Sequence, residues 1–340
     1  MDSLTQIVLG ASVAECTLGK KIGNKAVVWG AVLGTIPDLD VLGTHFLDTV
    51  DGLAFHRGFM HSIFFSILFS PVMGWVMKRI HAKEGVSLKE WSIMAFLCLV
   101  THPLLDCFTT WGTQLFWPFD YRVAFSSVFV IDPVYTLPFL FLLVISLFYK
   151  REASIRRLLN TTGLVLSTTF LGLTLVNKAM MTSAFLQEAQ RQNLPITAIE
   201  VRPAPLQNIL WTANLETENG YYIGYRSFLD DDDTINFQFY PKNAALLTPF
   251  AENDKLNQLL KITKGWYTVN QYDSTHYAIN DLRFGVVDGI RKTSNDFVFS
   301  YTMIVAPDKQ LTFEQKQYKF GKDVGEDTFK QLWQRIKGVK

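Results

Sequence analysis

The sequence is poor in cysteine, which occurs at three of its 340 positions. Cys16, Cys98 and Cys107 all lie in the apolar N-terminal half, so we expect small buried hydrophobic residues instead of a disulfide framework. Excess charge is also lacking, because 32 basic and 31 acidic residues give a net charge of +1. Proteins that bind nucleic acids usually carry a basic excess, so no nucleic-acid partner is expected.

The N-terminus lacks the features of a secretory signal peptide. No basic region precedes the first apolar segment, residues 3–18, and no convincing cleavage site follows it. This segment is short for a membrane span, so we interpret it as a full span or as a half-length or re-entrant helix.

Apolar segments are abundant in the first half of the chain. Besides residues 3–18 they cover 26–43, 59–77, 91–108, 128–149 and 158–177. Most are close to the ~20 residues that cross a bilayer. We therefore predict an α-helical membrane domain over residues 1–181, with five to six transmembrane or re-entrant helices. Pro37 should end the second helix, because proline lacks an amide proton.

Basic residues in the short connections predict the orientation of this domain. Connections 19–25, 78–90 and 150–157 contain eleven lysines and arginines, whereas 44–58 and 109–127 contain only two. Basic loops stay in the cytoplasm, so the second group of connections should face outward. The same rule places residues 182–340 outside the cytoplasm. We expect a multi-pass protein of the bacterial inner membrane, in contact with the lipid bilayer.

Residues 182–340 resemble an ordinary soluble domain, which we predict to be α+β with an antiparallel sheet. Stretches rich in Tyr, Phe, Val, Ile and Thr alternate with turn residues and indicate strands. They cover residues 209–217, 220–228, 234–241, 265–272, 276–285 and 296–305. Short helices are expected at 183–192, 253–263 and 326–336, and a linker or edge strand near Pro203 and Pro205. The acidic run 230–233 is interpreted as a solvated turn, since it lacks the pattern of a calcium loop.

One stretch of the membrane half, residues 34–62, concentrates ionisable side chains. Its 29 residues hold half of the six histidines together with four aspartates and an arginine. Such groups are costly at a membrane edge and usually mark a site, although a solvated acidic loop is the simpler alternative. The residues are Asp38, Asp40, His45, Asp48, Asp51, His56, Arg57 and His61.

The predicted topology brings further residues to the same depth. His102 and Asp106 are four positions apart, so they share one face of a helix. Asp132 lies at the outer end of the next segment, and Asp2 reaches the same side if residues 3–18 cross fully. Imidazoles with carboxylates, without a cysteine pair, suit zinc or a similar divalent metal. His56, His61 and His102 with one aspartate would give a centre with three or four ligands.

The remaining residues have open or structural interpretations. Other aspartates could act as general base, hold a second metal or orient the imidazoles. Arg57 could bind a phosphate oxygen or extend to the membrane interface. His45 is interpreted as an exposed loop residue, and His81 and His276 are excluded. Aromatic residues of the second outer connection fit an interfacial belt: Trp111, Trp117 and Tyr121.

Several spaced motifs resemble one family. They are MDSLTQIVLGA, GKKIGNKA, GTIPDLDV, HRGFMHS, THPLLDCFTTWGTQLFWPF and a later IDP, and they cover roughly residues 1–150. Together they resemble the YdjM-like membrane-bound metal-dependent hydrolases, also described as LexA-binding and inner-membrane-associated. The resemblance implies that the metal and catalytic set comprises Asp38, Asp40, His56, His61, His102 and Asp106. Gln6 stands where many relatives carry histidine. The HRG-x-x-H pattern is also similar to helical zinc-dependent phospholipase C proteins, which implies a phosphoester substrate.

From these observations we predict a metal-dependent hydrolase in which metal-activated water attacks a phosphoester or lipid-linked substrate at the outer membrane edge. Two alternatives are an ion or solute transporter that uses the same cluster and a non-catalytic anchor that presents the second domain to a protein partner. We assign metal binding, with zinc as the expected ion, to Asp38, His56, His61 and His102. We assign catalytic roles to Asp40, Arg57 and Asp106.

Overall fold

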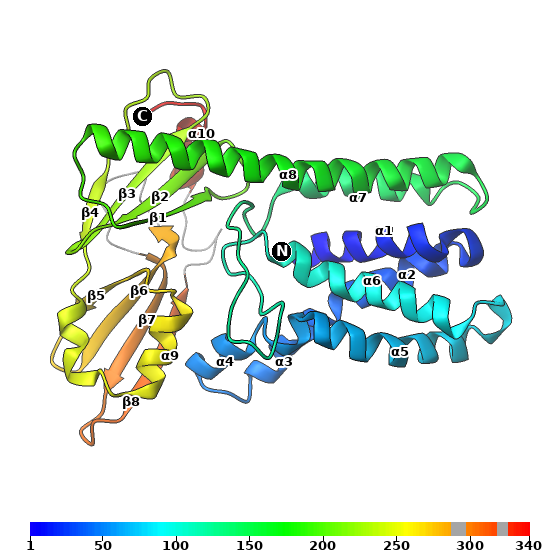
Figure 1. Cartoon of the computed structure of the whole chain (residues 1–340), viewed down its shortest axis with the longest axis horizontal. Coiled ribbons are helices and arrows are strands. Elements are labelled where there is room, and N and C mark those ends of the chain that lie inside the picture. Colours follow the sequence, from blue (N-terminus) through cyan, green and yellow to red (C-terminus); the bar gives the residue numbers. More distant parts are fainter. Residues whose placement is uncertain (287–296, 318–325) are drawn as a thin grey trace. The chain divides into compact units, whose positions relative to one another are not determined.

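The computed structural model describes residues 1–286, 297–317 and 326–340 and divides the chain into two compact units (Figure 1). The first contains Met1–Gly43, Phe55–Asn177 and Pro205–Gln207, and the second contains Thr44–Ala54, Lys178–Ala204 and Asn208–Lys340. The second unit therefore includes a short segment from the middle of the predicted membrane domain.

The first unit is helical. Its long helices lie side by side with their axes nearly parallel in Figure 1. They are α1 (Ser3–Ile22), α2 (Asn24–Thr35), α5 (Ile63–Ile80), α6 (Leu88–Asp106), α7 (Pro133–Ser146) and the first part of α8 (Ser154–Arg191). Short helical turns connect them: η1 (Pro37–Asp40), α3 (Val41–Thr44), η2 (Phe59–His61) and η3 (Ala82–Glu84).

Local sequence signals set where these helices begin. The Ser62 hydroxyl accepts a hydrogen bond from the Phe65 amide at the start of α5. Ser87 and Glu90 form a reciprocal capping box at the start of α6. Pro37 follows the end of α2 as predicted and opens the 3₁₀ turn η1. The two serine caps satisfy amide groups that would otherwise lack partners at a helix start, whereas Pro37 acts by lacking an amide proton.

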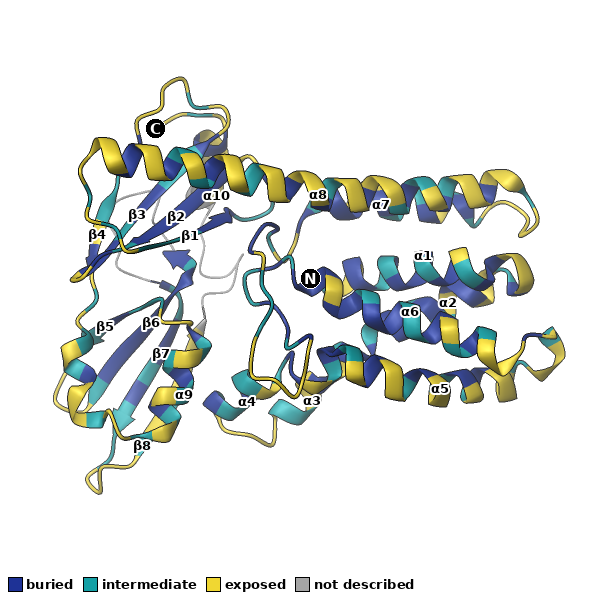
Figure 2. Cartoon of the chain, in the orientation of Figure 1, coloured by how far each residue is buried: buried dark blue, intermediate teal, exposed yellow. Residues whose placement is uncertain are grey.

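About four apolar segments are long enough to cross a membrane among the described residues: Asn24–Thr44, α5, α6 and α8. Of the other predicted spans, 128–149 yields only the 14-residue α7. Residues 3–18 form the 20-residue α1, which carries the buried Glu15. Exposed residues recur along α5 (Figure 2), and those that are large and apolar, as expected for contact with lipid, include Phe64, Ile67, Leu68, Val72 and Trp75.

Helix α8 differs from its prediction. The sequence indicated a span at 158–177 and a separate polar helix at 183–192, but one continuous helix of 38 residues covers both. Residues 178–182, which join the two predicted helices, contain no Gly or Pro, so the fall in hydropathy alone does not end the helix.

The second unit contains two four-stranded antiparallel sheets, where we predicted one. The first sheet has the order β1 (Ala198–Pro203), β2 (Leu210–Glu216), β3 (Gly220–Ser227) and β4 (Gln238–Pro241). The second has the order β5 (Tyr267–Gln271), β6 (His276–Val286), β7 (Phe297–Val305) and β8 (Leu311–Gln317). Strand β1 covers the region interpreted as a linker or edge strand, and β8 was not predicted.

Helices and short segments complete the cores of this unit. The C-terminal part of α8 packs Met181 and Phe185 against Trp211 and Leu215 of the first sheet. The second sheet shares an apolar cluster with α9 (Asp254–Ile262) and η4 (Ala244–Phe250). That cluster also contains Val50, from α4 (Thr49–Phe55). Helix α10 (Glu326–Ile336) contributes Leu332 and Ile336 to a further apolar cluster.

Candidate metal centre

Two short 3₁₀ turns and the long helix α6 bring two histidines and two aspartates together. Asp38 lies on η1, directly after Pro37 at the end of α2. His61 is the last residue of η2, and the next residue, Ser62, is the N-cap of α5. His102 and Asp106 lie one turn apart on α6, as their spacing predicted. The chain changes direction at Pro37 and at Gly58. These turns place the side chains of Asp38 and His61 against one face of α6.

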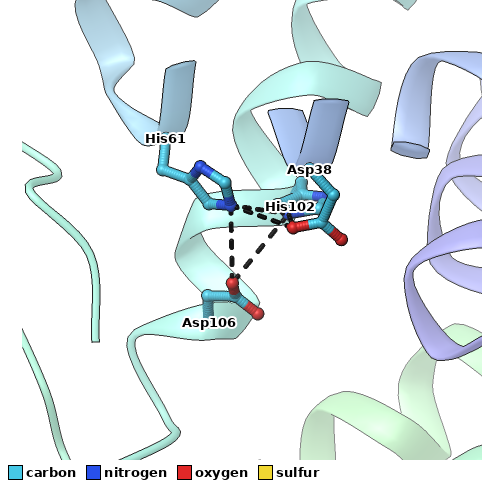
Figure 3. Close-up of side chains that lie close together, drawn as sticks. All are labelled: Asp38, His61, His102 and Asp106. Atoms are coloured by element: carbon cyan, nitrogen blue, oxygen red, sulfur yellow. Dashed lines mark hydrogen bonds and ion pairs between the residues drawn. The ribbon is translucent and has the colours of Figure 1, made fainter. Parts of the chain in front are cut away.

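The ligand atoms of these four residues all lie within 4.8 Å of one another (Figure 3). The Nε2 atoms of His61 and His102 are 3.2 Å apart. The Asp38 Oδ1 atom lies 3.2 Å and 3.4 Å from these two nitrogens. The Asp106 Oδ2 atom lies 3.7 Å and 3.9 Å from them. The side chains of His61, His102 and Asp106 are fully buried, whereas Asp38 is 28% exposed.

Neighbouring groups orient both imidazoles. His102 Nδ1 lies 2.6 Å from the carbonyl oxygen of Gly34, so it donates its proton there and leaves Nε2 with a lone pair. His61 Nδ1 lies 3.1 Å from Asp40 Oδ2, which favours the same tautomer. A carboxylate or carbonyl behind the second nitrogen is the usual support of a metal-bound histidine.

The two carboxylate oxygens of Asp106 have different surroundings. Its Oδ1 atom accepts a hydrogen bond of 2.9 Å from the Gln6 side chain and pairs with the amino group of Met1. Its Oδ2 atom is buried and has no hydrogen-bond partner. The Arg57 guanidinium, whose Nε atom lies 3.4 Å away, offsets the charge of Oδ2, but among the described residues no hydrogen bond satisfies this oxygen, and such burial is costly.

This arrangement fits a divalent metal. Zinc bonds of 2.0–2.2 Å in a tetrahedral site separate neighbouring ligand atoms by about 3.3–3.6 Å, close to the distances seen between these four residues. Burial alone would lower the pKa of His61, but hydrogen bonds with Asp38 and Asp40 and the charge of Asp106 raise it. The surroundings thus favour a cation at this point, either a proton or a metal ion.

The structure places His56 differently from the metal ligand that we predicted. Its Nδ1 atom lies 2.7 Å from Asp40 Oδ1, and its side chain is 30% exposed. His56 does not belong to the group of four residues whose ligand atoms lie together. Asp106, to which we assigned a catalytic role, does belong to it. Asp40 contacts His56, His61 and the backbone amide of Arg57 (3.0 Å), so it connects the buried centre with a more accessible imidazole.

Arg57 is buried, with 7% of its surface exposed, so it does not extend into the interface. Its Nη1 atom donates to the Thr109 hydroxyl (3.1 Å), and its Nε atom lies 3.4 Å from Asp106 Oδ2. Its φ of 62° lies in the left-handed region, which is costly for a residue other than glycine. The Gln114 amide donates to the Arg57 carbonyl and helps to hold this conformation.

Other acidic residues considered from the sequence lie outside the cluster. Asp132 caps α7 through the amides of Val134 and Tyr135, and Asp2 caps α1 through Thr5. Asp48 and Asp51 belong to the second unit. The family resemblance alone drew attention to Gln6, whereas support from Thr109 and the Gly34 carbonyl was not predicted, because a hydroxyl and a backbone group carry no metal-ligand signature.

The family assignment rests on the half of the chain that carries these residues. The model of the YdjM inner membrane protein family matches residues 1–182, more than half of the chain. The chain belongs to this family. Over 116 residues it is also 29% identical to the inner membrane protein YbcI of Escherichia coli (strain K12). That alignment covers 33% of this chain and 65% of YbcI, which is less than two thirds of the relative's length. No solved structure matches the chain.

Membership of the YdjM family agrees with the apolar helices of the first unit and identifies an inner membrane protein. The family match ends at residue 182, so the two sheets of this YdjM family member lie beyond it.

Proposed function

We propose that this YdjM family member is a metal-dependent hydrolase that cleaves a phosphoester at the outer edge of the inner membrane. The observation that carries the proposal is the convergence of two imidazole nitrogens and two carboxylate oxygens in a buried site. Zinc is the ion that best suits this set, because nitrogen and oxygen ligands are present and thiolate ligands are not among the four. When bound, zinc supplies a water molecule whose pKa is lowered toward ~7.

Accessibility indicates the side from which a substrate approaches. Among the four ligands, Asp38 alone is partly exposed. The partly exposed His56 and its partner Asp40 also border the buried residues. We propose that Asp40 fixes the orientation of the His56 imidazole, which then transfers a proton between the reacting group and solvent.

Arg57 supplies the positive charge that a phosphoester requires. Among the described residues, its side chain makes one hydrogen bond, to Thr109, and pairs with Asp106. Its other N–H groups remain for a phosphate oxygen, which guanidinium groups bind well. The left-handed backbone of Arg57 and its bond to Asp40 fix where the side chain starts.

The substrate class follows from the position of the site beside apolar helices. His61 lies two residues before the first residue of α5, and Asp106 is the last residue of α6. If both helices cross the bilayer, the centre lies at headgroup depth. A lipid or lipid-linked phosphoester is therefore the proposed substrate.

The proposal is tested by purifying the full chain in detergent and measuring bound metal and hydrolysis of a chromogenic phosphodiester. We expect stoichiometric zinc in the wild type, and loss of both zinc and activity in His61→Ala and His102→Ala. A chelator should abolish the activity and added zinc should restore it. His276→Ala is the matched control, because it removes an imidazole paired with an aspartate in the second unit.

A wild-type protein that retains no divalent metal at neutral pH would contradict the proposed centre. Stoichiometric metal without hydrolysis of phosphodiesters or phospholipids would contradict the enzymatic role and favour cation transport.

A further inference from the structure

Between Asp40 and His56, the chain passes from the first unit into the second unit and returns. Residues 44–54, which we call the anchor segment, belong to the second unit, whereas Asp40 and His56 belong to the first. Three residues separate Asp40 from the anchor segment, and Phe55 alone separates the segment from His56. Three residues reach at most about 11 Å, so the segment limits where these side chains can lie.

Apolar burial holds the anchor segment within the second unit. Val50 is 1% exposed and belongs to the cluster formed by α9, η4 and the second sheet. Leu53, one turn later on α4, packs against the same cluster. Removing such apolar side chains from water is strongly favourable, so this contact is the main attachment.

Charge adds a second, weaker attachment. Lys255 on α9 pairs with Asp48 at 2.7 Å and with Asp51. A hydrogen bond from the Asp51 amide, together with Lys255, lowers the pKa of Asp48, and the two aspartates raise the pKa of Lys255. All three side chains are partly exposed, and exposed ion pairs contribute little.

We propose that the anchor segment is a positioning element through which the second unit holds Asp40 and His56, and thereby His61, in the geometry of the metal centre. Asp40 is the connecting residue, since it contacts both His56 (2.7 Å) and His61 (3.1 Å). Val50 belongs to the second unit and the four ligands belong to the first, so Val50 acts through the backbone. The inference rests on the proposed metal site but adds a role for the second unit, whose residues after 182 lie beyond the family match.

The experiment uses the full chain in detergent and two measurements. Zinc affinity is measured by competition with a chelator, and hydrogen–deuterium exchange of residues 55–62 is measured without metal. We expect Val50→Asp to weaken zinc binding about tenfold or more, as loss of an outer support does, and to accelerate exchange in 55–62. We expect Lys255→Glu to weaken zinc binding by about two- to fivefold. Adding Asp51→Lys to Lys255→Glu should restore zinc binding.

Lys309→Glu is the control, because it makes the same charge change at an exposed position between β7 and β8. Normal zinc affinity and normal exchange in Val50→Asp would overturn the inference, as would a Lys255→Glu loss that Asp51→Lys does not restore. If Val50→Asp does not fold, Lys255→Glu and its reversal decide the question alone. A wild type without zinc would refute the proposed centre, but the exchange measurement would still test the anchor segment.

Discussion

The carboxylate of Asp106 has five neighbouring groups, two at one oxygen and three at the other. Gln6 and the Met1 amino group hold Oδ1, while Oδ2 faces two histidines and the guanidinium of Arg57. The side chain is fully buried and that of Arg57 is 9% exposed. In the described part of the chain, Asp106 is the carboxylate that pairs with Arg57. Removing one partner of such a pair leaves an uncompensated charge in a medium of low polarity.

We therefore expect Asp106→Asn to lower the free energy of unfolding by about 3–5 kcal/mol, even when a chelator has removed metal. Adding Arg57→Met should recover much of this loss, because no isolated charge then remains buried. Thermal unfolding in detergent measures both effects. Equal stabilities of the single and double variants would show that the pair is not coupled.

The sequence showed which residue types form the site. It did not show which aspartates lie in the metal centre and which cap helices. Asp132 and Asp2 resemble His102 and Asp106 in sequence, as polar residues at the edge of an apolar segment. Their carboxylates bind amides at helix starts instead, a use of aspartate that pattern alone does not distinguish from metal binding. The placement of His56 beside Asp40 depends on the turn at Gly58, which no periodicity predicts.

At the scale of elements, the contact between α1 and α2 determines the position of the Gly34 carbonyl, which orients His102. A Cβ atom at Gly34 would lie 2.5 Å from the Gln6 carbonyl oxygen, and one at Gly30 would lie 2.2 Å from the Gly10 carbonyl oxygen. Both contacts are with backbone, which cannot move aside alone. The glycines thus allow α2 to bring the Gly34 carbonyl to His102.

We expect Gly34→Ala to separate α1 from α2 and to weaken zinc binding about tenfold, because His102 loses its orienting carbonyl. Gly30→Ala should cost about 1–3 kcal/mol through overpacking with a smaller effect on zinc. Gly172→Ala on α8 is the control, since its Cβ would meet nothing within 4 Å. Zinc affinity and thermal unfolding separate the two effects. Unchanged affinity in Gly34→Ala would contradict the role of this contact.

Element types were predictable where a strong local rule applied. Pro37 ended α2, the His102–Asp106 spacing indicated one helix face, and alternating residues marked strands such as β2 and β3. Features decided by distant partners were missed. Strand β8, which pairs with β7, was not predicted, and the separation into two sheets depends on which strands pair. Strand pairing is set by tertiary packing, so local propensity does not reveal it.

At the scale of the whole molecule, the sequence indicated a change from membrane to soluble character near residue 181. The structural units divide α8 between Asn177 and Lys178 and also assign residues 44–54 to the second unit. Hydropathy could not reveal that assignment, because it reports the average polarity of a segment and not the core that buries Val50.

The orientation in the membrane remains a prediction from the basic loops, and a single pair of cysteines tests it. Phe46 in the anchor segment is 89% exposed, so Phe46→Cys should be accessible to a reagent. Lys83→Cys is the matched control, because it is exposed in the basic connection 78–90. Eleven basic residues should keep that side in the cytoplasm. A membrane-impermeant maleimide should therefore label Phe46→Cys in intact cells and Lys83→Cys only after permeabilisation. The opposite pattern would place the metal centre at the cytoplasmic edge and exclude substrates of the outer leaflet.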